Sequence, residues 1–352
     1  MRREGTPIVL DRRKGPFDAD IGQKMYLEKD LQGEYVTASG TDLIAGPVLA
    51  VDDDGTSLRM LLETPIEGGF RQYAFLLPSP QKVLADAEDA PKGDAPAQAD
   101  GGMASADIGM PGTNRAELER LFALIALTGL PEPGRLLFCS REPGRDGRAD
   151  SVDSRSGYFD TLFAREVGRG LSPEAQLREF RERGEQGGAW LQPCAITRIS
   201  GISTLDGIFA FVLGMLSFPA VAARSRREGV LLLDAGKKYL SAALVYRERV
   251  FSILEIPVSR VPDPVDAGMR QEFSRWLDDF RLGWLPPEAV RAMGGFVARA
   301  PELPAEAEGF RPTFITGDNA GMLEGYGREP RDGSCGGMVR CQGLLRACPK
   351  AE

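Results

Sequence analysis

The architecture of this chain is set by residues 229–255, which read GVLLLDAGKKYLSAALVYRERVFSILE. Two apolar runs flank the loop Asp-Ala-Gly-Lys-Lys at 234–238, and a third apolar run follows. Apolar runs of this length between turn residues are typical of buried strands, and Gly236 supplies the backbone freedom of a tight turn. The stretch therefore predicts a core hairpin with a third strand.

Composition narrows the class of protein. The chain has 352 residues, 42% of them hydrophobic, and a net charge of -8 at pH 7, which indicates a globular protein with more than one domain. An acidic balance argues against a nucleic-acid partner, because a surface that follows phosphates needs a basic stripe. The chain contains no histidine, so any acid or base must be a carboxylate, lysine, tyrosine or cysteine.

The cysteines and the apolar segments indicate the compartment. The five cysteines are odd in number and widely spread, as is typical of free thiols in a reducing compartment. The N-terminus lacks the apolar region of a secretory signal. The most apolar helix candidate, at 205–218, is too short to span a bilayer. We therefore expect a cytoplasmic protein without a membrane partner.

We predict three parts along the chain: an N-terminal extension at 1–46, a first lobe at 47–228 and a second lobe at 229–352 that ends in a cysteine-containing tail. Residues 85–112 are rich in Ala, Asp, Gly and Pro and poor in large apolar side chains. Such a segment gains too little from burial to offset its ordering entropy. We expect it to be a flexible linker within the first lobe.

Other apolar runs predict further strands and helices. An Asp-Gly pair at 54–55 between two apolar runs favours a hairpin over 48–63. The other expected elements are strands at 72–77, 135–139 and 310–316, helices at 114–129, 173–183, 206–216, 267–282 and 287–294, and a loop at 140–157. Because hairpins interrupt the order of strands and helices, we predict an α/β protein with antiparallel hairpins in mixed sheets.

Three glycine-containing turns leave strands, at 52–57, 234–238 and 316–321. Turns of this layout hold a nucleotide between the lobes of actin-like folds, where backbone amides, hydroxyl groups and carboxylates meet phosphate and Mg²⁺. The expected phosphate-binding residues are Asp52, Thr56, Ser57, Asp234, Gly236, Lys237, Thr316 and Gly317. Asp52, Asp53 or Asp54 would hold Mg²⁺, and Asp52 is the residue we choose. The commoner interpretation of such turns is structural, because they occur in any hairpin protein.

The C-terminal cysteines Cys335, Cys341 and Cys348 also invite a metal-binding interpretation. They form no Cys-x-x-Cys pair, and no histidine completes a tetrahedral site. We expect free thiols and no iron-sulfur cluster.

Five segments resemble, in the same order, an uncharacterised bacterial and archaeal family that is labelled as related to pyruvate formate-lyase activating enzyme. They read LAVDDDGTSLRMLLETPIEG, FLLPSPQKVLA, GVLLLDAGKKYLSAALV, FITGDNAGML and GGMVRCQGLLRA, and the resemblance covers about residues 48–347. The resemblance implies a two-lobed actin-like ATPase (ribonuclease H-like) architecture. The activase label itself conflicts with the sequence, because a radical-generating activase needs a Cys-x-x-x-Cys-x-x-Cys motif.

The chain departs from that family at polar positions and keeps the apolar framework. Lys238, Tyr239 and Leu240 stand where the family pattern has Gly-His-Thr. Two functions follow from the resemblance. The first is a weak nucleotide or phosphate binder that uses ATP or ADP with magnesium. The alternative is a non-catalytic binding or assembly protein, a pseudoenzyme that keeps the fold and binds a protein partner.

Overall fold

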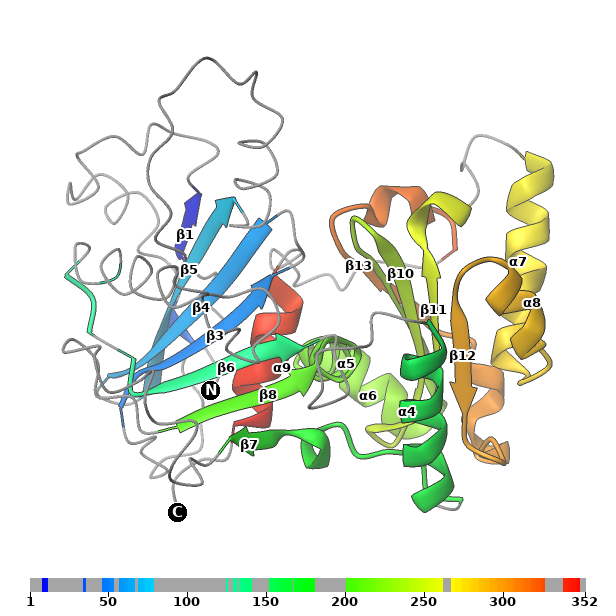
Figure 1. Ribbon diagram of the computed structural model, residues 1–352, viewed down its shortest axis with the longest axis horizontal. Helices are drawn as coiled ribbons and strands as arrows, with labels where there is room; N and C mark the ends of the chain where they lie inside the picture. Colours follow the sequence, from blue (N-terminus) through cyan, green and yellow to red (C-terminus); the bar gives the residue numbers. More distant parts are fainter. Residues whose placement is uncertain are drawn as a thin grey trace, which may run out of the picture.

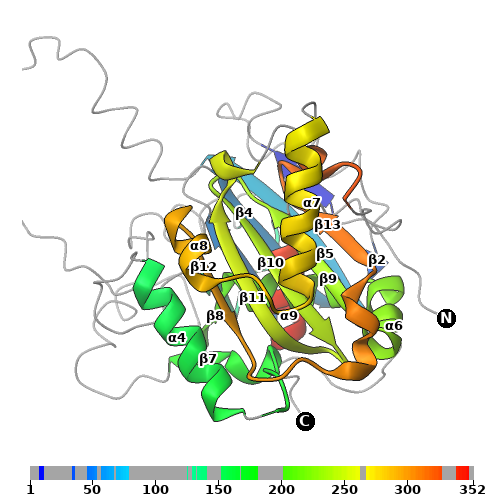
Figure 2. The same ribbon diagram turned by 90° about the vertical axis from the view of Figure 1, so that its right-hand side faces the viewer.

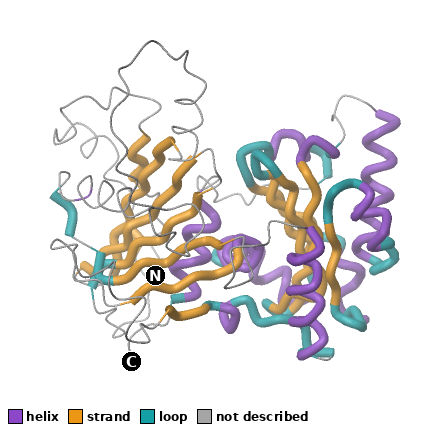
Figure 3. Tube along the Cα trace, viewed as in Figure 1, coloured by secondary structure: helices purple, strands orange, loops and turns teal. Residues whose placement is uncertain are grey.

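A computed structural model describes residues 8–11, 34–35, 46–53, 57–66, 69–78, 125, 129–131, 133–140, 152–166, 168–180, 201–261, 267–326 and 338–348. Two β-sheets stand side by side, with helices between them and on the outer side of the second sheet (Figures 1 and 3). Each sheet contains both parallel and antiparallel pairs. The prediction of a two-lobed α/β protein with antiparallel hairpins in mixed sheets is confirmed.

The first sheet has eight strands, and seven of them follow the order β1-β5-β4-β3-β6-β8-β7, while β2 pairs with β5. The strands are β1 (Ile8–Asp11), β2 (Glu34–Tyr35), β3 (Val48–Asp53), β4 (Ser57–Ile66), β5 (Gly69–Pro78), β6 (Arg135–Ser140), β7 (Arg178–Phe180) and β8 (Gly201–Asp206). β3, β4 and β5 form the antiparallel hairpins that the apolar runs predicted. β6 lies parallel to β3 and to β8, which places the C-terminal ends of these three strands at one edge.

The second sheet has five strands in the order β12-β11-β10-β9-β13. They are β9 (Val230–Ala235), β10 (Tyr239–Tyr246), β11 (Arg249–Pro257), β12 (Phe296–Arg299) and β13 (Thr313–Thr316). The hairpin predicted at 229–255 is confirmed as β9 and β10, with β11 as the third strand. β9 is buried along its whole length, as its continuous apolar run requires.

Six α-helices complete the described part of the chain: α4 (Val152–Arg165), α5 (Gly207–Leu216), α6 (Pro219–Arg227), α7 (Ala267–Arg281), α8 (Pro287–Ala292) and α9 (Val339–Ala347). α5, α7 and α8 confirm predicted helices, and α7 and α8 cover the outer face of the second sheet (Figure 2). Among these residues no single helix reaches the length and hydropathy of a membrane span. α5 and α6 do so only as a pair bent by 98°.

Four expectations about helices and loops need correction or lie outside the described residues. The helix predicted at 173–183 is wrong, because only a 3₁₀ turn (Glu174–Gln176) forms there and β7 then pairs with the edge of β8. The loop predicted at 140–157 is wrong in its last part, where α4 begins. The linker at 85–112 and most of the helix at 114–129 lie outside the described residues.

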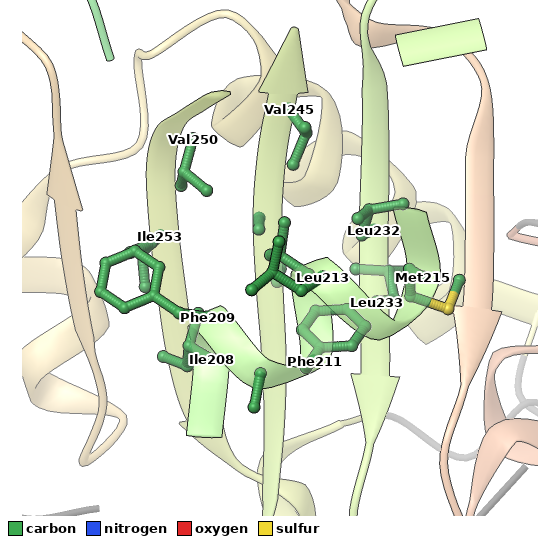
Figure 4. Packing of buried hydrophobic residues seen from close by; sticks show 14 of the residues in the cluster. Ile208, Phe209, Phe211, Leu213, Met215, Leu232, Leu233, Val245, Val250 and Ile253 are labelled. Atoms are coloured by element: carbon green, nitrogen blue, oxygen red, sulfur yellow. The ribbon is translucent and has the colours of Figure 1, made fainter. Parts of the chain in front are cut away.

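α5 is the centre of the hydrophobic core. All ten of its residues are buried. Its apolar side chains pack on β9, β10 and β11 of the second sheet (Figure 4). The opposite side of α5 lies against α9, which in turn packs on β3, β4 and β6 of the first sheet. The order of layers is therefore first sheet, α9, α5 and second sheet, as Figure 1 shows.

Two glycines allow α5 and α9 to cross at very short range. A Cβ atom placed on Gly214 of α5 would stand 1.9 Å from the carbonyl oxygen of Val339. One placed on Gly343 of α9 would stand 1.7 Å from the carbonyl oxygen of Ala210. No side chain fits at either position without moving a helix backbone.

Helices on either side of the predicted lobe boundary at 228/229 pack on the sheet of the other lobe. α4, which precedes the boundary in sequence, packs on β12 of the second sheet. α9, which follows it, packs on the first sheet. Residues far apart in sequence therefore meet at the junction between the sheets.

Candidate functional site

Described residues of the three predicted glycine-containing turns, at 52–53 and 57, 234–238 and 316–321, meet at the junction between the two sheets, while residues 54–56 of the first turn lie outside the described residues. The Lys237 ammonium donates a hydrogen bond to the Ser57 hydroxyl at 2.6 Å, which joins the second turn to the first. The Asn319 side-chain amide donates to the carbonyl oxygen of Gly236 at 2.8 Å, which joins the third turn to the second. Arg59 and Asp318 form an ion pair between the first sheet and the third turn.

Asp234 is buried at the end of β9, in register with Thr316 on β13 and with Ser241 on β10. Gly317 follows Thr316 with a φ of 105°, and a Cβ atom there would stand 2.6 Å from Asp234 Oδ1. Only glycine combines this backbone angle with this approach. The two turns are therefore in direct contact.

Arg340 links the buried carboxylates of both lobes. From α9 it donates to Asp234 Oδ2 through Nε at 3.0 Å and through Nη2 at 2.7 Å. Its Nη1 lies 3.7 Å from Asp52 Oδ1. Arg59 Nη1 lies 3.7 Å from the other oxygen of Asp52. Burial lowers the pKa of Arg340, but Asp234 and Asp52 more than offset this effect, and the pKa stays well above its usual value.

Asp318 is the outer anion of this network. Its carboxylate forms an ion pair with Arg59 and lies 3.8 Å from the Lys237 ammonium. Asp52, Ser57, Arg59, Asp234, Lys237, Asp318 and Arg340 are called the junction site below. Asp52 and Asp234 form its buried side, and Lys237 and Asp318 form its partly exposed side.

Two thiols border the junction site. Burial, with the nearby Asp52 carboxylate, raises the pKa of both Cys139 and Cys341 well above the usual value. Both are free thiols, while Cys335 lies outside the described residues. In the ranges that the structure describes, no group of three or more cysteines and carboxylates is arranged to hold a metal ion.

A second buried arginine lies deeper between the lobes. Arg155 of α4 donates to Asp206 at 3.0 Å, and its Nε lies 3.6 Å from Glu255 on β11. Its guanidinium also packs 5.6 Å from the ring centroid of Phe159 and 5.7 Å from that of Phe296. Asp206 in turn caps α5 by accepting a hydrogen bond from a backbone amide at 2.9 Å. This cluster braces α4 and α5 against the second sheet.

The expected site residues differ in how they are placed. Asp52, Ser57, Asp234, Lys237 and Gly317 come together as described above. The Gly236 amide is engaged within its own hairpin, where it donates to the carbonyl oxygen of Tyr239 at 3.0 Å. Thr56 lies outside the described residues.

Four charged residues between the lobes were not anticipated from the sequence, namely Arg59, Asp318 and Arg340 of the junction site and Arg155 of the deeper cluster. Asp318 falls within the third glycine-containing turn, so the prediction of that turn could have identified it as a site residue. No spacing or motif marked the three arginines, because each pairs with at least one carboxylate far away in sequence.

Comparisons with known proteins give matches to solved structures at low sequence identity and low TM-score. No family model matches the chain, and no curated protein matches it, so the activase-related label has no support. The ethanolamine utilization protein EutJ from Carboxydothermus hydrogenoformans is 10% identical, with a TM-score of 0.36 over 94% of this chain and 98% of that chain.

Two other solved structures give similar values. A protein of unknown function with an actin-like ATPase fold from Bacteroides thetaiotaomicron is 7% identical, with a TM-score of 0.39 over 86% of this chain and 96% of that chain. A chain of the PilM-PilN type IV pilus biogenesis complex is 10% identical, with a TM-score of 0.39 over 86% of this chain and 99% of that chain. These identities and TM-scores are too low to transfer a ligand or a reaction to this chain.

Proposed function

We propose that the protein is a weak binder of phosphate groups, such as those of ATP or ADP, at the junction site. One observation carries the proposal: Arg59 and Lys237 converge from different lobes on a single carboxylate, Asp318. Two cations that share an anion in this way also suit the oxygens of a phosphate. Asp318 therefore marks the position that a phosphate would take.

The difference in burial between the carboxylates supports this assignment. The side chains of Lys237 and Asp318 are 27% and 29% exposed, whereas those of Asp52 and Asp234 are 3% and 7% exposed. Asp318 can turn toward water at low cost, which leaves Arg59 and Lys237 to the ligand. Because the ligand must displace an internal anion, its affinity is reduced by the cost of that exchange.

Thermal unfolding with millimolar ADP or ATP tests this function. A ligand at 100 times its dissociation constant adds about 2.7 kcal/mol to the free energy of unfolding. Asp318→Asn removes the competing anion, so we expect the dissociation constant to fall by about tenfold, which corresponds to about 1.4 kcal/mol. Lys237→Met removes one of the two cations and should weaken binding by a similar factor.

Arg275→Met provides a matched control, because Arg275 is an exposed residue of α7. This variant should bind as the wild type does. The absence of a thermal shift in both the wild type and Asp318→Asn would rule out phosphate binding at this site.

A second candidate function is a non-catalytic binding or assembly protein. It is favoured by the contacts of Arg340 with Asp52 and Asp234, which join the lobes through the chain's own charges. This function predicts a stable complex with a protein partner at fixed stoichiometry, together with no response to ADP or ATP in Asp318→Asn. Nucleotide binding that strengthens in that variant would decide against it.

A further inference from the structure

We infer that phosphate binding at the junction site does not require a divalent metal, because the guanidinium of Arg340 takes the place of a cation between Asp52 and Asp234. This inference rests on the proposed function and specifies its cofactor requirement. It replaces the expectation from the sequence that Asp52 holds Mg²⁺.

The carboxylates that would hold Mg²⁺ are already engaged by arginine. Arg340 contacts Asp234 at 2.7 and 3.0 Å, and it lies 3.7 Å from Asp52. Arg59 lies 3.7 Å from the second oxygen of Asp52. Mg²⁺ needs near-octahedral oxygen ligands at about 2.0–2.1 Å and would meet a fixed positive charge here. The residues of this site therefore do not fit Mg²⁺.

The charges of the buried side are balanced without a metal. Asp52 and Asp234 carry two negative charges, and Arg340 and Arg59 carry two positive charges. Both arginines stay protonated at any ordinary pH. A divalent ion between the same two carboxylates would supply the charge that the two guanidinium groups already provide.

The backbone that carries Arg340 is held in place by helix packing. The preceding residue, Val339, packs its carbonyl oxygen on Gly214 of α5. Gln342 donates to the Gln72 side chain on β5 at 2.7 Å, which ties α9 to the first sheet. The guanidinium also passes beside Gly207 and Gly236, where a Cβ atom would stand 3.7 and 4.0 Å from its nitrogens. Arg340 is thus a built-in part of the site.

The direct test compares binding with and without metal. The affinities of the wild type for ADP and for inorganic phosphate are measured by titration calorimetry, once in excess magnesium chloride and once in excess EDTA. We expect each pair of dissociation constants to agree within about threefold. Manganese alone, followed by its paramagnetic resonance signal, should show no binding to the wild type.

Substitution of Arg340 should create a metal requirement. In Arg340→Met the two carboxylates lose their shared cation, so we expect affinity in EDTA to fall by about tenfold or more and magnesium to restore it. The same variant should bind manganese. Arg340→Lys keeps a positive charge and should stay independent of metal.

Arg346→Met is the matched control on the same helix. The ion pairs of Arg346 with Glu174 and Glu248 lie at the surface, away from the junction site. This variant should behave as the wild type does with and without metal.

The outcomes separate this inference from the proposed function. Binding by the wild type that needs magnesium overturns the inference and leaves phosphate binding intact. No binding under either condition, in the wild type and in Asp318→Asn, overturns phosphate binding itself. If Arg340→Met does not fold, the wild type in EDTA, the manganese titration and Arg340→Lys still decide the question.

Discussion

Cys341 lies fully buried in α9, where burial and the Asp52 carboxylate raise the pKa of its thiol. In the unfolded chain the same thiol ionises above about pH 8.5. Above that pH the thiol loses its proton in the unfolded state but keeps it in the native state. The contribution of this thiol to the free energy of unfolding is therefore complete below about pH 8.5 and declines as the pH rises. Each such thiol should lower the free energy of unfolding by about 1.4 kcal/mol per pH unit.

Urea unfolding between pH 7.5 and 10, in the presence of a reductant, measures this slope. Cys341→Ala removes one of the two raised thiols, so its stability should decline less steeply with pH than that of the wild type. Equal slopes for the two proteins would show that Cys341 ionises alike in both states.

At the scale of single residues, the sequence predicted the residues of the turns better than it predicted the charged residues that pair with them. Asp52 and Asp234 lie near the C-terminal ends of β3 and β9, Lys237 lies in the turn after β9, and the structure brings them together. Their counter-charges come from Arg59 and Arg340, and Arg340 reaches Asp234 from a helix 106 residues further along the chain. Local patterns carry no information about such long-range ion pairs, which the packing of α9 determines.

Gly343 and Gly214 determine how α5 and α9 cross. A methyl group on Gly343 would collide with the carbonyl oxygen of Ala210 at 1.7 Å, and backbone cannot turn aside as a side chain does. We expect Gly343→Ala to lower the free energy of unfolding by about 3 kcal/mol or more. Chemical denaturation measures the loss.

Gly157→Ala is the control for this substitution. Gly157 lies in α4 with open space around its Cα, so alanine adds helix propensity without a collision. This variant should be more stable by about 0.5–1 kcal/mol. A Gly343→Ala variant as stable as the wild type would mean that the two helices are free to separate.

At the scale of elements, the strongest sequence signals were continuous apolar runs and helical segments with start and stop residues at their ends. The strands β3, β4, β5, β9 and β10 and the helices α5, α7 and α8 follow from them. The segment after Pro173 has a helix start signal, but pairing with the exposed edge of β8 outweighs that local preference. α4 buries few large side chains, mainly Phe159 and Phe163, among polar residues, so its pattern was typical of a loop.

The whole molecule should unfold as one unit. A single cluster of buried side chains runs from Val48 and Leu61 in the first sheet, through α5, to the second sheet. Because α5 and α9 are shared between the lobes, neither sheet keeps its cover when the other opens. Differential scanning calorimetry should show one transition whose calorimetric and van't Hoff enthalpies agree. Two resolved transitions would indicate that the lobes are independent.

The position of α9 in the chain has a consequence for synthesis on the ribosome. α5 is made before the second sheet, and its side that carries Ala210 and Gly214 packs on α9, which is made only after the whole second sheet. Until α9 emerges, the first sheet and α5 lack the layer that separates them. The junction charges are also incomplete, since Arg340 belongs to that layer. Closure of the two lobes is therefore a late step, and a nascent chain that stalls before residue 338 presents an uncovered apolar helix to chaperones.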